Sequence, residues 1–490
     1  MTPVANPSLE WLRLAPALAP VVGLLLVLLL DALWPKQRGL HVAIGALSLA
    51  AGASAAVPGA LSTADAPVLS LCLPGGLEGA CLWSAGPIAS TLQIGMLAST
   101  LAVLLLMLDG DRGDAVDVVL LLGAAAGGSA VAASRDLGTW LVTLELATIP
   151  IVALVALRRA GRAVHAATTL LMTSLLSFAL LVVGVALWLT ATSDPSFSEV
   201  SVRAAWADPT TRPVLAVAAI ALFAGLAFKL SLVPFHAWTP IAWGEGPIPI
   251  TTLLASTSKL AATAALVVVL EPFAAVVGAH PGPHAVAFVL GALAIASMVV
   301  GTVVAFRQHD VVRLLAWSTL AQGGWVVLPL AALSAAGARA AAAYALVYAA
   351  AVIVAFSAVS TLPSRRLTAY TGLIRTHPHV GLPLAFALLT FAGLPPGVLG
   401  LVAKVAAMRA PAQVGLWPLS VLAVVGVVLG IAVYARWLAV LLATPAPRGV
   451  DASDGEAFEV GRGAMAVLAI GTALLLVASV LPNVLFGLLG

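Results

Sequence analysis

Long apolar runs separated by short polar breaks make up nearly all of this 490-residue chain. A run of about 20 apolar residues is long enough to cross a bilayer as an α-helix, and the polar breaks divide the chain into fourteen such spans. We expect them near residues 11–33, 39–59, 88–108, 115–134, 139–157, 166–191, 213–234, 247–270, 285–306, 311–333, 337–361, 380–409, 414–443 and 463–489. The pattern predicts an all-α polytopic membrane protein, because a β-barrel would show short segments of alternating polarity.

Two of these spans contain helix-breaking residues. Span 7 runs into VPFHAWTP, and span 12 reads FAGLPPGVLGLVAK, with Pro395 and Pro396 in mid-membrane. Proline lacks a backbone donor and interrupts a helix, and interrupted helices at membrane depth are buried in protein or line a wet cavity. Paired interruptions in two halves of a chain favour inverted repeats with a site at the midplane.

Composition agrees with this fold class and suggests an orientation. The residues are 62% hydrophobic and 9% charged, with a mean hydropathy of +1.11. Loops that follow odd-numbered spans, or lie close to them, carry fourteen Lys and Arg residues, against six on the opposite side. Cytoplasmic loops carry such an excess, so we expect both termini outside the cytoplasm. Glu10 and Arg13 open the first run, which favours a retained span over a signal peptide.

Cys72 and Cys81 are the only cysteines, and they share the loop after span 2. The expected orientation places this loop on the oxidising face, where the two thiols can form a disulfide or remain free. A zinc site is not expected there, because structural zinc needs four ligands and no His is near.

Few ionisable residues lie inside the apolar runs. Of four lysines, Lys229, Lys259 and Lys404 lie in long apolar stretches, and Glu145 is the only acid in the middle of a span. Arg stays protonated, whereas a buried Lys can lose its proton, and an ionisable group in a membrane helix is by default a functional hypothesis. The pattern predicts that these four residues transfer protons.

Each of the four has a competing interpretation. A Glu145–Lys229 pair would switch between ionised and neutral forms as it closes and opens; alternatively, it only fixes packing. Lys259 lies near the middle of span 8 among Ser and Thr side chains that can hold water, which favours a relay over a snorkelling side chain. For Lys404, with Arg409 close behind, snorkelling remains an alternative.

Three further residues are auxiliary candidates. His236 lies beside Trp238, where a structural role is the usual one, and Tyr344 and Tyr348 lie at helical spacing, where packing is the default and a polar relay the alternative. No P-loop or Rossmann glycine pattern, CxxC cluster or paired membrane His is present. We therefore expect no metal, redox cofactor or nucleotide in this chain, and the energy for proton movement must come from a partner or an ion gradient.

Three segments resemble the signature blocks of one family, the antiporter-like subunits of respiratory complex I. They are AFKLSLVPFHAWTPIAWGEGPIPITTLLASTSKLAATA, RQHDVVRLLAWSTLAQGGW and GLIRTHPHVGLPLAFALLTFAGLPPGVLGLVAK, and the likeness covers roughly residues 115–440. Span 12 contains a Lys at a position where sibling subunits tend to have an acidic residue. In this respect the chain resembles subunit N. Departures are Gln322 where a His is common, Val312 where a Lys often precedes Arg313, and only His165 and Thr168 in a block that usually has Glu and Lys.

The resemblance implies a layout and a set of roles. Spans 4–8 (115–270) and 9–13 (285–443) would be inverted five-helix repeats with helices 7 and 12 broken, preceded by a three-helix segment (1–114) and followed by a loop and a last helix (444–490). Glu145–Lys229 would be the switch, Lys259 the central relay and Lys404 the connection to the outer face. Quinone, FMN, iron–sulfur clusters and NADH would bind partner subunits.

We therefore expect a proton-translocating subunit of a bacterial NADH–quinone oxidoreductase. It would lie in the inner membrane beside sibling antiporter-like subunits and bind no nucleic acid. One alternative is a membrane subunit of a multi-subunit cation/proton antiporter. Another is a scaffold that only anchors its neighbours.

Overall fold

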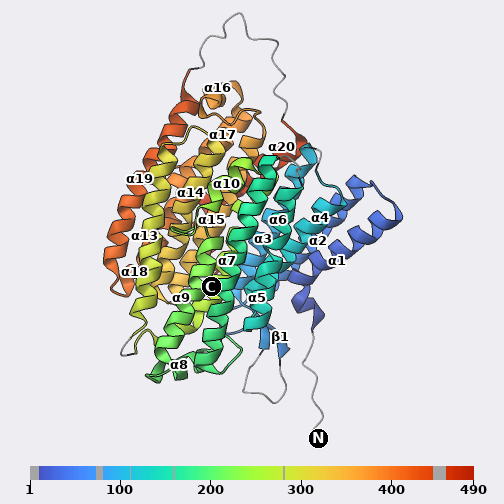
Figure 1. The fold of residues 1–490 in the computed structure, drawn as a ribbon. Coiled ribbons are helices and arrows are strands. Elements are labelled where there is room, and N and C mark those ends of the chain that lie inside the picture. Colours follow the sequence, from blue (N-terminus) through green and yellow to red (C-terminus); the bar gives the residue numbers. More distant parts are fainter. Residues whose placement is uncertain (1–9, 73–80, 111, 158–160, 280–281, 445–459) are drawn as a thin grey trace, which may run out of the picture.

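The chain forms a bundle of membrane-length helices. The computed structural model describes residues 10–72, 81–110, 112–157, 161–279, 282–444 and 460–490. Within these ranges, thirteen helical segments are long and apolar enough to cross a membrane. They run alongside one another, with α1 and α2 at one flank and α13 and α19 at the other (Figure 1).

The elements fall into three groups. Ten helices are uninterrupted: α1 (Trp11–Leu33), α2 (Arg38–Ala60), α3 (Pro87–Leu106), α4 (Ala115–Ala133), α7 (Gly161–Thr192), α13 (His284–Phe306), α14 (Val311–Val327), α15 (Ala335–Ser360), α19 (Trp417–Leu442) and α20 (Arg462–Val480). Eight form broken spans: α5 (Leu137–Leu146), α6 (Ile149–Ala156), α9 (Arg212–Lys229), α10 (Trp238–Glu245), α11 (Ile248–Ala255), α12 (Thr257–Leu270), α17 (Pro378–Ala392) and α18 (Val398–Gln413). The short elements are α8 (Glu199–Ala207), α16 (Leu373–Thr376), α21 (Pro482–Gly487), η1 (Met107–Asp109), η2 (Glu271–Val276), η3 (Leu328–Ala332), η4 (Leu367–Tyr370), β1 (Val68–Cys72) and β2 (Cys81–Ala85).

The helices show one predicted break and differ from the expected fourteen spans in two ways. The span 380–409, which was predicted to be broken, is divided into α17 and α18, and neither part alone has membrane length. Spans 5 and 8 are also interrupted, at 147–148 and at Ser256, which the sequence pattern missed. The prediction of purely helical structure is wrong between α2 and α3, where β1 and β2 pair antiparallel and a disulfide joins Cys72 to Cys81.

Burial separates central from peripheral helices. The most apolar window of Ile248–Val276, which contains α11 and α12, is 94% buried, whereas that of α19 is 22% buried. Peripheral helices present exposed Leu and Val side chains, which suits contact with lipid. The central position of α12, α14 and α15 places their polar residues away from lipid.

Both ends of the described chain lie on one face of the bundle. The Glu10 backbone N–H donates to Ser70 Oγ in β1 at 3.4 Å. At the other end, Gly490 accepts a hydrogen bond from Arg339 at the start of α15 and lies beside Pro87 at the start of α3.

Candidate functional site

Glu145 and Lys229 form an ion pair between two broken spans. Lys229 Nζ lies 2.9 Å from Glu145 Oε1 and also donates to Thr148 Oγ1 at 2.7 Å. The Lys229 side chain is 4% exposed and that of Glu145 13%. Pro150 explains the interruption between α5 and α6, because it has no N–H for the carbonyl of Leu146, four residues earlier.

The chain reverses its local conformation directly after Lys229. Ser231 has φ +62°, in the left-handed region that few non-glycine residues occupy. The Val233 N–H, which would bond to the Lys229 carbonyl in a continuing helix, donates instead to Ser297 Oγ at 3.0 Å. The break therefore leaves the Lys229 carbonyl free to accept from another group.

Lys259 donates a hydrogen bond to this free carbonyl. Its Nζ donates to the Lys229 carbonyl at 2.8 Å and to Ser231 Oγ at 2.5 Å, and Thr239 Oγ1 donates to the same Ser231 oxygen. The ammonium also lies 5.2 Å from the centre of the Trp238 ring, within cation–π range. Glu145, Lys229 and Lys259 are thus joined in sequence through side-chain and backbone contacts.

The hydroxyls of α11 and α12 have other partners. Thr252 and Ser256 donate to carbonyls one turn earlier in the chain, at 2.8 and 2.7 Å. The hydroxyl that contacts Lys259 comes instead from Ser231, in the break of span 7. Lys259 lies in the first turn of α12, after the interruption at Ser256, and not in the middle of a continuous helix.

Lys404 is held by the break that the double proline creates. In a continuous helix the carbonyls of Phe391 and Ala392 would accept from residues 395 and 396, but both are prolines and have no N–H. Lys404 Nζ donates to these two carbonyls, at 2.7 and 2.9 Å. Lys404 is 2% exposed, so the snorkelling alternative is wrong.

A second polar cluster lies beside Lys404. Gln322 Nε2 donates to the Tyr434 hydroxyl at 2.6 Å, and the Tyr344 hydroxyl donates to Gln322 Oε1 at 2.5 Å. Ser318 bonds to Tyr434 at 2.5 Å. A cavity of about 10 Å3 is lined by Lys404, Gln322, Ser318 and Tyr434, a size and polarity that suit a single water molecule.

The auxiliary candidates have different surroundings. Tyr344 belongs to the Gln322 cluster, and the Tyr348 hydroxyl bonds to Thr319 Oγ1 at 2.7 Å. His236 lies edge-on to Trp317 with ring centres 5.4 Å apart, and its Nδ1 has no hydrogen-bond partner among the described residues. In the same ranges, no group of three or more His, Cys, Asp or Glu could hold a metal ion.

Several residues of this arrangement were not among the sequence candidates, including Thr148, Ser231, Gln322 and Tyr434. Thr148 lies three residues after Glu145, so a helical wheel would have placed it on the same face as the acid. Ser231 gives no such signal, because its contact with Lys259 depends on a left-handed backbone conformation. Tyr434 comes from α19, and only the packing of the bundle brings it to Gln322.

A polytopic helical bundle with buried Lys residues at broken helices is the architecture of an antiporter-like membrane subunit. Comparison with known proteins identifies the family. The model of the NADH:quinone oxidoreductase/Mrp antiporter transmembrane family matches residues 134–430. The chain belongs to this family, and the predicted membership is confirmed.

Individual relatives agree with the resemblance to subunit N. NADH-quinone oxidoreductase subunit N 2 of Streptomyces griseus is 34% identical, over 92% of this chain and 85% of the relative. Subunit N of Deinococcus radiodurans is 29% identical, over 96% of both chains.

Solved structures show the same fold. A chain of respiratory complex I from Thermus thermophilus with bound aureothin superposes with a TM-score of 0.78 at 27% identity, covering 96% of this chain and 98% of that one. A chain of the Mrp complex from Dietzia superposes with a TM-score of 0.84 at 19% identity, covering 98% and 96%. The second likeness is one of fold alone.

Proposed function

We propose that this chain is a proton-translocating membrane subunit of a bacterial NADH:quinone oxidoreductase, lies in the inner membrane and performs no redox chemistry itself. Family membership supports the complex, in which NADH, FMN, iron–sulfur clusters and quinone would bind partner subunits. The observation that carries the translocating role is the continuous buried contact from Glu145 through Lys229 to Lys259, which lie at three helix breaks.

We count fourteen crossings in this proposal. The broken pair α17–α18 supplies one crossing besides the thirteen long segments, and an even number agrees with chain ends on one face. The loop excess of Lys and Arg supports an extracytoplasmic location for that face. The proposed inverted repeats are residues 115–270 and 285–443, between the segments 1–114 and 444–490.

The proposed mechanism is electrostatic. A conformational or charge change in the quinone-reducing arm opens or closes the Glu145–Lys229 pair. Because Lys259 binds the backbone carbonyl of Lys229, a change in the pair alters the charge near Lys259 and the position of the carbonyl that it binds. The free energy of holding a proton on Lys259 then changes, and the proton is released toward the second repeat.

Close packing between the halves supports a route to Lys404. At Gly323, a side-chain carbon would lie 2.9 Å from the Leu230 carbonyl, so α14 touches the break in span 7. The neighbouring Gln322 belongs to the cluster whose cavity Lys404 lines. In this proposal, water and the Gln322 cluster carry the proton to Lys404, which delivers it to the outer face.

The test is proton yield per NADH oxidised in reconstituted complex carrying Lys259→Ala. We expect the yield to fall while the complex still assembles. An unchanged yield would favour the scaffold role instead.

A cation/proton antiporter subunit is the second candidate, because the family model includes Mrp antiporters and the fold matches an Mrp chain. Purification with native partners separates the two. Flavin and iron–sulfur proteins support the oxidoreductase, and exclusively small membrane subunits support the antiporter.

A further inference from the structure

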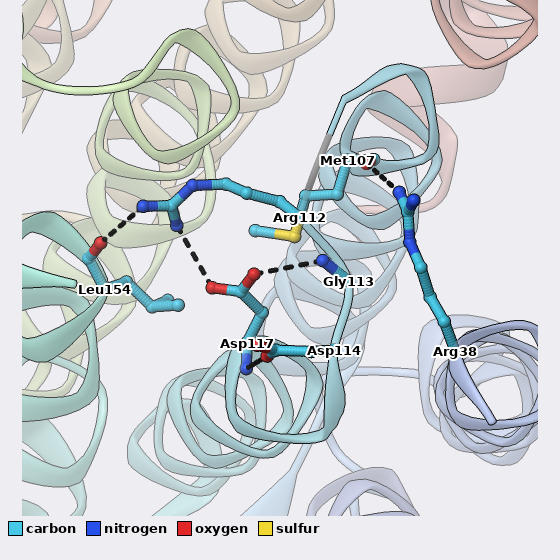
Figure 2. Close-up of polar contacts among 7 residues, drawn as sticks. All are labelled: Arg38, Met107, Arg112, Gly113, Asp114, Asp117 and Leu154. Carbon is cyan, nitrogen blue, oxygen red and sulfur yellow. Dashed lines mark hydrogen bonds and ion pairs between the residues drawn. The ribbon is translucent and has the colours of Figure 1, made fainter. Parts of the chain in front are cut away.

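The loop between α3 and α4 is hydrogen-bonded to the end of α6 that lies away from Glu145. Arg112 Nη2 donates to the Leu154 carbonyl at 3.2 Å, and Nη1 lies 3.1 Å from Asp117 Oδ1 (Figure 2). The other carboxylate oxygen of Asp117 accepts from the Gly113 N–H at 3.0 Å. The Asp117 side chain is 7% exposed and that of Arg112 18%, so water competes little for these bonds.

This contact satisfies a group that the helix itself leaves open. Leu154 lies in the last turn of α6, where carbonyls have no donor within the helix and carry partial negative charge. A guanidinium is well suited there, because its fork donates to the carbonyl and to a carboxylate at once. Asp117 therefore fixes Arg112, and Arg112 fixes α6.

α6 connects this contact to the ion pair. It has eight residues and is about 12 Å long at 1.5 Å per residue. Its N-cap is Thr148, whose hydroxyl binds Lys229. At that end α4 approaches again, since a side-chain carbon on Gly127 would lie 2.4 Å from the Ala147 nitrogen. α4 and the loop before it thus hold α6 at both ends.

We propose that Arg112 and Asp117 are positioning residues for proton transfer: by holding the far end of α6, they set where Thr148 and Glu145 meet Lys229. This inference rests on the proposed function. It assigns a mechanical role to an ion pair that touches none of the proton-carrying side chains.

Arg38, the first residue of α2, contacts the same loop and provides a matched control. On the side of the loop that faces α2, it donates to the Met107 carbonyl at 2.8 Å, as Figure 2 shows, and to the Gly110 carbonyl at 2.7 Å. Loss of Arg38 removes a guanidinium and its carbonyl contacts without touching α6. A general effect of loosening the loop would appear in both variants.

The experiment compares Arg112→Gln, Arg112→Lys and Arg38→Gln in the intact complex. Hydrogen exchange of peptides covering residues 147–156 should accelerate at least about tenfold in Arg112→Gln, the least that loss of a hydrogen bond to a charged group predicts. The proton yield per NADH should fall toward that of Lys229→Ala. Arg112→Lys should partly restore both the exchange rate and the proton yield, because Lys keeps the positive charge but lacks the forked guanidinium. Arg38→Gln should leave the proton yield unchanged.

The outcomes separate this inference from the proposed function. If Lys229→Ala abolishes translocation but Arg112→Gln translocates normally, the positioning role is wrong and the proposed function stands. Equal losses in Arg38→Gln and Arg112→Gln also overturn the positioning role. If Lys229→Ala translocates normally, the proposed function fails, and exchange in α6 still decides whether Arg112 holds that helix.

Discussion

Removing the charge of Glu145 separates a structural ion pair from a functional one. Glu145→Gln keeps the shape of the side chain but leaves the Lys229 ammonium with Thr148 as its only other side-chain partner in the described structure. If the pair is the switch, proton translocation should be lost while the complex still assembles.

The magnitude follows from the geometry. Two unit charges 2.9 Å apart interact by about 6 kcal/mol at an effective dielectric constant of about 20. Leaving one partner of a buried pair uncompensated costs about 3–5 kcal/mol, and the Thr148 hydrogen bond offsets little of this. The charged form of Lys229 therefore becomes unfavourable by a factor of roughly 100 or more, since about 1.4 kcal/mol is tenfold.

The assay is acidification of inverted membrane vesicles, measured by quenching of a pH-sensitive dye while NADH absorbance reports electron transfer. Glu271→Gln is the matched control, because it breaks a Glu–Arg pair, at 3.3 Å, whose carboxylate is 54% exposed. Such a surface pair contributes at most about 1 kcal/mol, so translocation should stay normal.

The double variant Glu145→Gln/Lys229→Gln gives the decisive comparison. Removing both charges abolishes the uncompensated ammonium, so thermal stability should recover relative to Glu145→Gln. Translocation should remain lost. A double variant that recovers stability and also translocates normally would refute the switch and leave the pair a packing device.

Substitutions at three other residues test the remaining contacts. Lys404→Met should abolish dye quenching while native electrophoresis shows an assembled complex; normal quenching would remove Lys404 from the route. Ser231→Ala should lower the melting temperature of the complex, since a buried charged donor on Lys259 loses an acceptor worth about 1–3 kcal/mol, and an unchanged melting temperature would contradict the 2.5 Å contact. Gln322→Leu should slow translocation, whereas Gln322→His, which can still accept and donate, should retain it; equal rates in both would exclude the cluster.

The sequence predicts both the position of the helix break near Lys404 and the two carbonyls that it leaves without donors. Two consecutive prolines remove the donors for two consecutive carbonyls, of Phe391 and Ala392, and a buried cation is the natural replacement. The sequence pattern predicted the interruption. The partner of those carbonyls needed the fold, because Lys404 lies twelve residues beyond Ala392 in another helix.

The other breaks show where sequence reasoning stops. Pro150 is a local signal for the interruption after Leu146, although the apolar pattern alone hid it. Ser256 has no proline or glycine within four residues on either side, so its φ and ψ of −110° and −81° have no such signal in the neighbouring sequence. The apolar periodicity of span 8 is the same for a continuous and a broken helix.

The three buried lysines differ in the charge that would remain beside each of them after it lost its proton, and this difference supports the roles proposed for them. Lys259 and Lys404 are held by backbone carbonyls, each also beside a Trp ring, and within the described ranges no carboxylate forms an ion pair with either. Either can release a proton and leave only neutral dipoles. Lys229 differs, because losing its proton to any group other than Glu145 would leave the Glu145 carboxylate unpaired in a buried site. Lys229 is therefore suited to be the switch, and Lys259 and Lys404 to carry the protons.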